Sequence, residues 1–254
     1  MSLRIWDPSL RDSELRATLK GHTRAISSDR GKVVSGSDDQ SELVWDKHTT
    51  QLLEELKGHD AQVSIVRTLS GERILTAALD GTLKMWDVRT DKCAATVGRC
   101  SSAVLCMEYD DSSGILAAGG RDAVVNIWDI RAGRQMHKIL GHSKWIRSIR
   151  MVGDTLITGS DDWTARMWSV SQGSCDAVLA SHDSPVLSVE YSVADKGIIT
   201  GGIRCVENVT FKKVPILSIN AGEHWLGVGA ADNSIGLRWG PGNSMQLHKH
   251  HLIR

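Results

Sequence analysis

Residues 141–169 read GHSKWIRSIRMVGDTLITGSDDWTARMWS, and three features of this stretch recur elsewhere in the chain. The first is the pair Gly141-His142. The second is Asp162, which follows that histidine by 20 residues, and the third is the apolar–Trp pair Met167-Trp168. Because the same features return in the same order, the chain is predicted to be built from one repeated structural unit.

An apolar–Trp–Asp tripeptide marks the repeat outward from this stretch. The copies are Ile5-Trp6-Asp7, Val44-Trp45-Asp46, Met85-Trp86-Asp87 and Ile127-Trp128-Asp129, and Met167-Trp168-Ser169 is a variant copy. Successive tryptophans lie 39 to 42 residues apart. Gly-His recurs as Gly21-His22 and Gly58-His59, with Ser181-His182 as a variant, and the aspartate recurs as Asp39, Asp80 and Asp122.

Between these marks, apolar and polar residues alternate with a period of two. One repeat predicts four short strands, at Ala103–Tyr109, Ile115–Ala118, Val124–Trp128 and Gln135–Leu140, with turn residues between them. Four antiparallel strands in about 40 residues are typical of a propeller blade. We therefore predict an all-β propeller of about seven four-stranded blades.

This pattern resembles the WD-repeat family. In that family each blade is held by a buried network of four side chains, here called a tetrad. The Asp of a turn accepts from the His imidazole, which reaches a Ser or Thr hydroxyl that also accepts the indole N–H of the Trp. The resemblance implies three tetrads: His22, Ser35, Asp39 and Trp45; His59, Thr76, Asp80 and Trp86; and His142, Thr158, Asp162 and Trp168.

The repeats are unequal. We predict a single propeller domain with units at 1–20, 21–57, 58–98, 99–140, 141–180, 181–211 and 212–254, of which the first and sixth are incomplete. The first unit begins inside a third strand. The sixth lacks a turn aspartate and a third strand, because Gly201-Gly202 runs straight into Ile203-Arg204. The fourth has Arg99-Cys100 and Ala118 where the histidine and the hydroxyl are expected.

The chain also resembles the C-terminal propeller of plant proteins that join a DENN module to WD repeats, the stomatal cytokinesis defective family. The resemblance covers essentially the whole chain and is most specific over residues 141–151, 154–166 and 218–223. DENN proteins are typically exchange factors for Rab GTPases. The resemblance therefore implies a non-catalytic interaction scaffold in membrane traffic, cytokinesis or endocytosis, with trafficking factors as partners and no exchange activity of its own.

Two tryptophans outside the repeat signature are candidates for a binding surface. Trp145 follows His142 by three residues, and Trp163 follows Asp162 where the family usually has glycine. Family topology puts both loops on the top face of the propeller, and exposed Trp beside Arg is typical of protein-binding hot spots. The other side chains expected there are Lys144, Arg147, Arg121 and Asp161. Alternatively, Trp145 packs against the neighbouring blade and Trp163 covers a turn.

A second reading is that the chain is a substrate receptor of a cullin-type ubiquitin ligase. Such receptors often carry Trp-Asp-x-Arg after the third strand, and two copies occur here, ending at Arg89 and Arg131. These arginines would supply the charge that docks on the ligase adaptor. Alternatively, both are solvated loop residues.

An enzyme is the poorest reading. The His, Asp and hydroxyl of a tetrad resemble a hydrolase triad, but the indole partner and the repetition favour a structural role. The sequence offers no other nucleophile–base pair and no Gly-rich phosphate loop. We expect no catalytic residue, no cofactor and no metal, and interpret His248-Lys249-His250-His251 as a tail.

The amino-acid composition indicates which classes of partner the chain can bind. Lys plus Arg and Asp plus Glu both number 30, so the chain lacks the positive field that holds nucleic acid or anionic lipid. Five cysteines without a C-x-x-C spacing argue against a disulfide scaffold or zinc. Without a long apolar run or a signal peptide, we expect a cytoplasmic protein that binds other proteins and reaches vesicles or the plasma membrane only through them.

Overall fold

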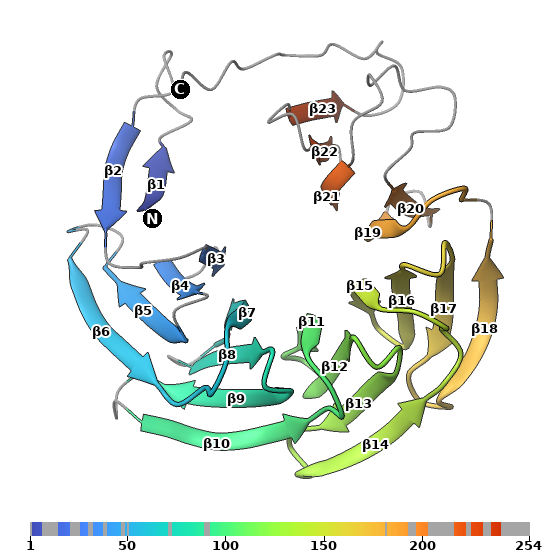
Figure 1. The fold of residues 1–254 in the computed structure, drawn as a ribbon, viewed down its shortest axis with the longest axis horizontal. Helices are drawn as coiled ribbons and strands as arrows, with labels where there is room; N and C mark the ends of the chain where they lie inside the picture. The colour runs from blue at the N-terminus through green and yellow to red at the C-terminus, as the bar shows by residue number, and fades with distance from the viewer. Residues whose placement is uncertain are drawn as a thin grey trace. The chain divides into compact units, whose positions relative to one another are not determined.

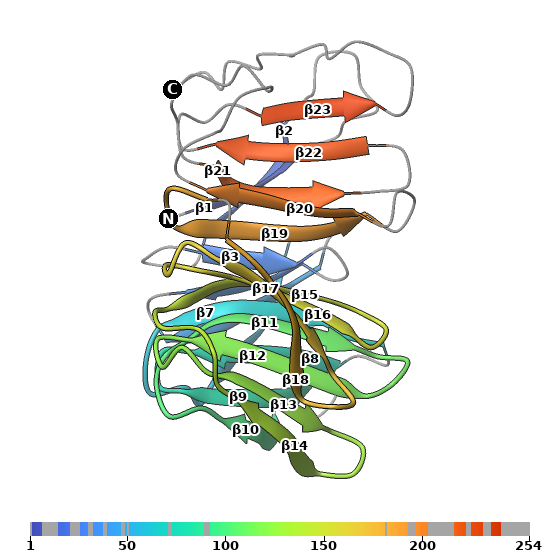
Figure 2. The ribbon, with the colours of Figure 1, turned by 90° about the vertical axis from the view of Figure 1, so that its right-hand side faces the viewer.

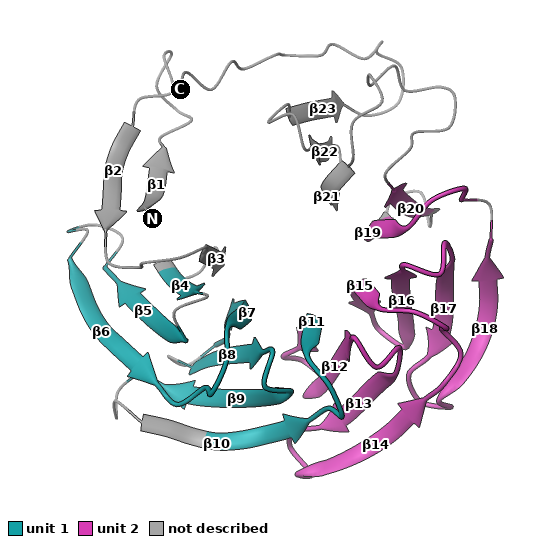
Figure 3. Cartoon of the chain, viewed as in Figure 1, with its two compact units in different colours: residues 1–106 teal, residues 107–254 magenta. Residues whose placement is uncertain are grey.

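The computed structural model describes the backbone of residues 2–6, 15–20, 26–29, 33–37, 40–46, 49, 51–70, 73–88, 92–180, 182–192, 197–202, 216–221, 225–230 and 235–239. Side chains are described for residues 34–37, 40–46, 49, 51–70, 73–88, 95–180, 182–191 and 198–202. Every regular element in these ranges is a β-strand, and no helix that could cross a membrane is found in them. The chain forms two compact units, Met1–Cys106 and Met107–Arg254 (Figure 3).

Four of the sheets have four antiparallel strands in chain order, as Figure 1 shows. They are β3–β6 (Ile26–Asp29, Val33–Ser37, Ser41–Trp45, Leu52–Lys57), β7–β10 (Val63–Thr68, Arg73–Ala78, Thr82–Asp87, Lys92–Arg99), β11–β14 (Val104–Asp110, Ile115–Gly120, Val125–Asp129, Arg134–Ile139) and β15–β18 (Ile146–Val152, Thr155–Ser160, Ala165–Ser169, Ser174–Leu179). Each is one blade, so the prediction of four-stranded antiparallel units is confirmed.

The remaining three sheets have two or three strands each in the described ranges. They are β1–β2 (Ser2–Trp6, Leu15–Lys20), β19–β20 (Val186–Ser192, Gly197–Gly202) and β21–β23 (Ile216–Ala221, Trp225–Ala230, Ile235–Trp239). Figure 2 shows the antiparallel course of β21–β23. The first and sixth sheets have two strands each in the described ranges, and the incompleteness expected of these two units stays a prediction because the flanking residues lie outside those ranges.

The strand limits differ from the predicted ones by one or two residues. In the fourth sheet, β13 starts at Val125 rather than at Val124 and continues to Asp129. Asp129 pairs with both Ile115 and Arg134, so the ladder extends one position beyond the tryptophan. The left-handed backbone of Ala123, with a φ of 60°, holds the preceding turn and delays the start of the strand.

A register shift beside the tryptophan recurs between third and fourth strands. The pairing shifts between Ile127 and Trp128, and between Met167 and Trp168. Val44 and Trp45 show the same shift, as do Ile5 and Trp6. Such a bulge bends the outer strand and increases its twist at the same place in each of these sheets.

The core lies between neighbouring sheets within each unit. In the first unit, Val34 and Val44 pack with Val63, Val66 and Trp86 of the next sheet. In the second unit, Ile157 and Ala165 pack with Val186 and Val189. The approach is close, because a Cβ atom on Gly159 would lie 2.8 Å from Val186 Cγ1.

One arginine joins three successive first strands of the second unit. Arg150 of β15 places Nη1 2.7 Å from Glu108 Oε1 of β11 and Nε 2.7 Å from Glu190 Oε1 of β19. Ser148 adds a second link, because its Oγ accepts the backbone N–H of Val189 over 3.0 Å. Polar contacts therefore accompany apolar packing across these sheets.

Candidate protein-binding site

The tetrad of His59 is a closed chain of buried hydrogen bonds. The indole N–H of Trp86 donates to Thr76 Oγ1 over 2.8 Å, and His59 Nε2 lies 2.8 Å from the same hydroxyl oxygen. On the other side of the imidazole, Nδ1 lies 3.1 Å from Asp80 Oδ2. Because the Asp80 carboxylate only accepts, Nδ1 carries the proton and Thr76 donates to Nε2.

The tetrad of His142 has the same bonds. Trp168 Nε1 donates to Thr158 Oγ1 over 2.8 Å, His142 Nε2 lies 2.7 Å from that hydroxyl, and Nδ1 lies 2.7 Å from Asp162 Oδ2. Steric crowding explains the glycine of Gly-His, since a Cβ atom on Gly141 would lie 2.8 Å from the Trp168 ring. The tryptophan therefore packs directly beneath the loop that carries the histidine.

The other repeats hold parts of this network. Trp45 Nε1 donates to Ser35 Oγ over 2.9 Å, while His22 and Asp39 lie outside the described residues. In the sixth unit, His182 Nε2 lies 2.6 Å from Thr200 Oγ1. The fourth unit has Ala118 in place of the hydroxyl, yet its sheet is complete. A four-stranded blade can therefore form without a full tetrad.

Protonation follows from these contacts. Burial lowers the pKa of His59 and of His142, against the opposing effect of Asp80 and Asp162, so both imidazoles are neutral at pH 7. Burial alone would raise the pKa of Asp162, but hydrogen bonds from Thr164, His142 and Ser143 outweigh it and lower that pKa to about 2. The groups thus form hydrogen bonds within a rigid network rather than a reactive triad.

Glu42 is a polar residue that the sequence reasoning missed. It stands three residues before Trp45, where the corresponding residues of later repeats are Leu83, Val125 and Ala165, all buried. Its side chain is fully buried, and its Oε1 lies 3.6 Å from His59 Nε2. Neither carboxyl oxygen has a partner with good hydrogen-bond geometry among the described residues, and burial raises its pKa to about 8 against the opposing effect of the nearby Thr76 hydroxyl. Aligning the repeats by their tryptophans would have singled it out.

The turn between the second and third strands has the same conformation in several repeats. The residue after the turn aspartate has a positive φ: 71° at Gln40, 81° at Gly81, 60° at Ala123 and 71° at Trp163. Glycine adopts this backbone without strain, whereas a bulky side chain rarely does. Trp163 is therefore held in a conformation that its side chain disfavours, and the residue is 48% exposed.

The second tryptophan is flanked by arginines. Trp145 is 38% exposed and comes from the loop before β15. The Arg121 Cζ lies 4.7 Å from the centre of its ring, and the Arg147 Cζ lies 4.8 Å from it. Arg121 belongs to the turn between β12 and β13, so Trp145 does contact the neighbouring blade while a large part of its ring stays exposed.

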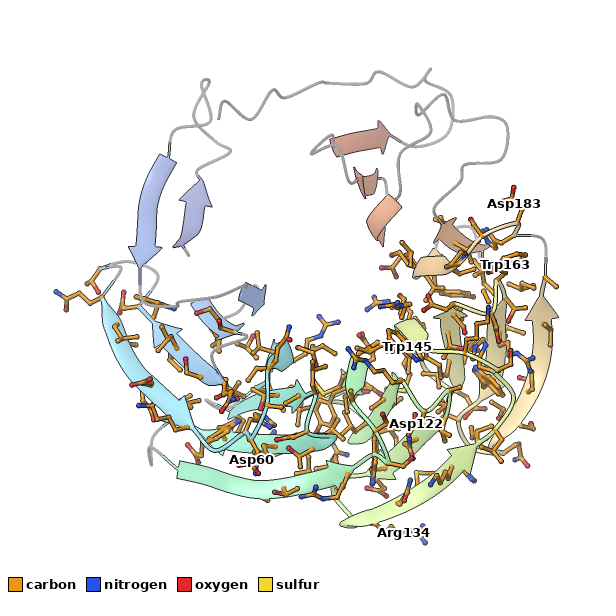
Figure 4. All side chains as sticks on the ribbon, in the orientation of Figure 1. Asp60, Asp122, Arg134, Trp145, Trp163 and Asp183 are labelled. Carbon is orange, nitrogen blue, oxygen red and sulfur yellow. The ribbon has the colours of Figure 1, made fainter. Side chains whose placement is uncertain are left out.

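Acidic and basic groups alternate around the tryptophans. Arg147 donates to Asp161 in a two-pronged arrangement, with Nε and Nη2 2.8 to 3.0 Å from the carboxylate oxygens. Lys144 Nζ lies 5.9 Å from the centre of the Trp163 ring. We call this set the tryptophan patch: Arg121, Lys144, Trp145, Arg147, Asp161 and Trp163. Figure 4 labels both tryptophans and the adjacent Asp122.

A cavity of about 370 Å³ opens at the patch. Its walls are Arg121, Asp122, Ala123, Ser143, Lys144, Trp145 and Asp161. The loop is tied to the turn, because the Asp161 N–H donates to the Trp145 carbonyl over 2.9 Å and Ser160 Oγ donates to the Lys144 carbonyl over 3.2 Å. Ser143 and Ala123 were not foreseen as part of the site.

The arginines of the second reading lie elsewhere. Arg131 donates from Nη2 to the Asp111 carbonyl over 2.7 Å, so its head group holds the turn before β12. Arg89 lies outside the described residues, as does the His248–His251 run. In the described part of the chain, no group of three or more His, Cys, Asp or Glu is placed to hold a metal ion.

Comparison with known proteins shows the family. Residues 50–87, 91–129 and 133–169 match the family described as WD domain, G-beta repeat. The chain belongs to the WD-repeat family. The WD-repeat propeller is therefore its fold class, and family membership supports a non-catalytic scaffold that binds other proteins. The computationally designed Ika8 protein is similar in fold, with a TM-score of 0.77 and 21% identity over 90% of this chain and 75% of that one.

Three relatives place these WD repeats among longer proteins. The chain is 72% identical over 259 residues to the DENN domain and WD repeat-containing protein SCD1 of Arabidopsis thaliana, covering 95% of this chain and 22% of the relative. Nuclear distribution protein nudF of Aspergillus niger is 25% identical, with 94% and 60% covered. Autophagy-related protein 16 of Arabidopsis thaliana is 29% identical, with 75% and 40% covered. The chain thus matches the WD region of SCD1.

Proposed function

We propose that this chain is the interaction module of a DENN-linked membrane-trafficking protein and that it holds its partners through the tryptophan patch. The observation that carries the proposal is the patch itself, with two exposed tryptophans beside arginine and lysine, of which Trp145 also lines a cavity. Large aromatic rings with adjacent Arg are the side chains that most often dominate protein–protein binding energy. The 72% identity to SCD1 supports the trafficking context.

The backbone at Trp163 adds to this argument. A tryptophan at a φ of 71° is disfavoured relative to glycine, and such strain collects at functional sites. The alternative role, covering a turn, gives no reason to prefer Trp over the Gly81 of an equivalent turn. A contribution to binding supplies that reason.

The test is an exchange of WD regions in a plant that lacks SCD1. The matching region of the Arabidopsis protein is replaced by this chain, either unchanged or with Trp145→Ala and Trp163→Ala. We expect the unchanged chain to restore uptake of a lipophilic endocytic dye and the double variant to lose most of that uptake at equal protein level. A fluorescent tag on the exchanged protein is expected in the cytoplasm and on vesicles.

A matched control is Arg134→Ala on β14, which alters an exposed cation outside the patch. Equal rescue by the double variant and by the control would exclude the patch as the partner site. Proximity labelling with the same proteins separates the two readings of function. Labelling of a ubiquitin ligase adaptor that depends on Arg131, without trafficking factors, would favour the ligase reading.

A further inference from the structure

We infer that the tryptophan patch binds a peptide segment in which a single carboxylate side chain neighbours an apolar one. The inference rests on the proposed function and specifies the chemistry of the partner. It follows from which cations at the patch already have an acidic partner, from the charge of the cavity walls and from the rigidity of the loops.

Of the three cations in the patch, Arg121 and Lys144 have no acidic partner among the described residues and can bind an incoming anion. Arg147 is engaged by Asp161 through both nitrogens of its fork. Arg121 and Lys144 contact the tryptophan rings, and neither forms an ion pair with a carboxylate of the described residues. A guanidinium stacked on a ring still presents its N–H edge, which matches a carboxylate in a bidentate pair. Arg121 is therefore the anchor for an incoming acidic side chain.

The balance of charge selects a carboxylate over a phosphate. The cavity walls carry Arg121 and Lys144, but also Asp122 and Asp161. Each phosphate dianion brought into this cavity would meet two carboxylates as well as two cations. A single negative charge can pair with Arg121 and meets less of that repulsion than a dianion does. The chain as a whole has a net charge of +0, so no wider positive field attracts polyanions.

The exposed rings of Trp145 and Trp163 favour a ligand with an apolar side chain. Trp145 and Trp163 expose 38% and 48% of their surface, and Ala123 lies in the cavity wall beside Arg121. An aliphatic or aromatic side chain next to the carboxylate would cover this surface. One backbone hydrogen bond, and a second bond donated by the Ser160 hydroxyl, tie the loop that carries Trp145 to the turn that carries Trp163, so little ordering is needed on binding.

The experiment is a selection from a phage library of random 12-residue peptides on the whole chain. Clones that also bind the Trp145→Ala, Trp163→Ala double variant are removed. We expect the remaining peptides to carry Asp or Glu within two positions of an aliphatic or aromatic residue. A selected peptide is then synthesised with its acidic residue unchanged, as the amide, and as phosphoserine.

Fluorescence anisotropy then measures the affinity of the chain for each of the three peptides. The acidic peptide should bind at least tenfold more tightly than the amide and than the phosphoserine peptide. Arg121→Gln should remove most of the preference for acid over amide, Trp163→Gly should weaken all three peptides, and Arg134→Gln should change nothing. Trp163→Gly keeps a residue suited to the positive φ, so its effect on binding is not an effect of misfolding.

Three outcomes would overturn the inference: no patch-dependent peptides, peptides without an acidic residue, or a preference for phosphoserine. An unchanged acid preference in Arg121→Gln would do the same. These failures differ from failure of the proposed function. If the double variant loses rescue in the plant while Arg121→Gln keeps it, the patch binds partners but does not read a carboxylate.

Discussion

The tetrads of His59 and His142 have the same four side-chain types and the same bonds, yet their surroundings differ at two positions. A buried carboxyl group, Glu42, faces His59, whereas the equivalent residue before the His142 repeat is Val125. The turn after Asp80 continues with Gly81, whereas the turn after Asp162 continues with Trp163. The shared bonds are the part of the tetrad that the two repeats have in common, and the two differences show where one repeat departs from the other.

Removing Glu42 should have the largest effect on stability. The unfolded chain titrates this carboxyl near 4.5 and the folded chain near 8, so the stability contributed by its proton is complete below pH 4.5 and is lost as pH rises through 8. A difference of 8 − 4.5 = 3.5 in pKa corresponds to a loss on the order of 5 kcal/mol. Urea unfolding at pH 5 and pH 9 should show this loss as a difference between the natural chain and Glu42→Leu, because the buried histidines, whose pKa values are lowered, titrate in both.

Glu55→Gln is the matched control for this change, because Glu55 lies on the neighbouring strand β6 and is exposed. Its profile should follow that of the natural chain. Parallel curves for Glu42→Leu and the natural chain would mean that the buried carboxyl does not hold its proton.

Removing the hydroxyl of a tetrad should have the second-largest effect on stability. In Thr158→Val, His142 Nε2 and Trp168 Nε1 lose their partner, at a cost of about 2 to 4 kcal/mol. In Thr76→Val the loss should be smaller, because the protonated carboxyl of Glu42 lies 3.6 Å from His59 Nε2 and can donate to it after a small shift. Denaturant unfolding at pH 7 measures both, with Thr155→Val at the start of β16 as a control.

An equal loss in the two threonine variants would show that Glu42 cannot replace the hydroxyl. The double variant Glu42→Leu, Thr76→Val sharpens this point, because it should lose as much as Thr158→Val.

Substitutions at the turn residues should change the free energy of unfolding least. The change should be positive for Trp163→Gly and negative for Gly81→Ala. Trp163→Gly relieves a positive φ and should raise the free energy of unfolding by about 1 kcal/mol. Gly81→Ala should lower it, because a Cβ atom there would lie 2.9 Å from the Cys100 carbonyl oxygen. Loss of stability in Trp163→Gly, measured by the same unfolding, would identify Trp163 as a cover for the turn instead of a binding residue.

Repetition made much of the fold predictable. The period fixed the strand number of a blade, and the tetrad residues could be named because each plays one role at one spacing. Strand limits were less predictable, since they depend on pairing partners such as Asp129 with Arg134 rather than on local alternation. The tripeptide signal also gave no sign of the bulge beside each tryptophan.

The candidate site was predictable in part. Trp145 and Trp163 could be noticed because they break the repeat pattern, and Arg121 could be placed near them through family topology. The stacking of Arg121 on Trp145 and the cavity walls depend on how two loops of different blades approach each other, which a single sequence does not encode locally. Glu42 was missed because a lone glutamate in a strand is normally a solvated side chain.

Arg150 has a consequence for how the second unit comes apart. Because one guanidinium is shared by Glu108 and Glu190, releasing the sheet of β19 and β20 also frees a charge that the sheet of β11–β14 uses. The sheet with two described strands is thereby coupled to two sheets of four strands. Amide hydrogens of β11, β15 and β19 should then exchange together, as one cooperative opening event, instead of being lost blade by blade from the end of the array.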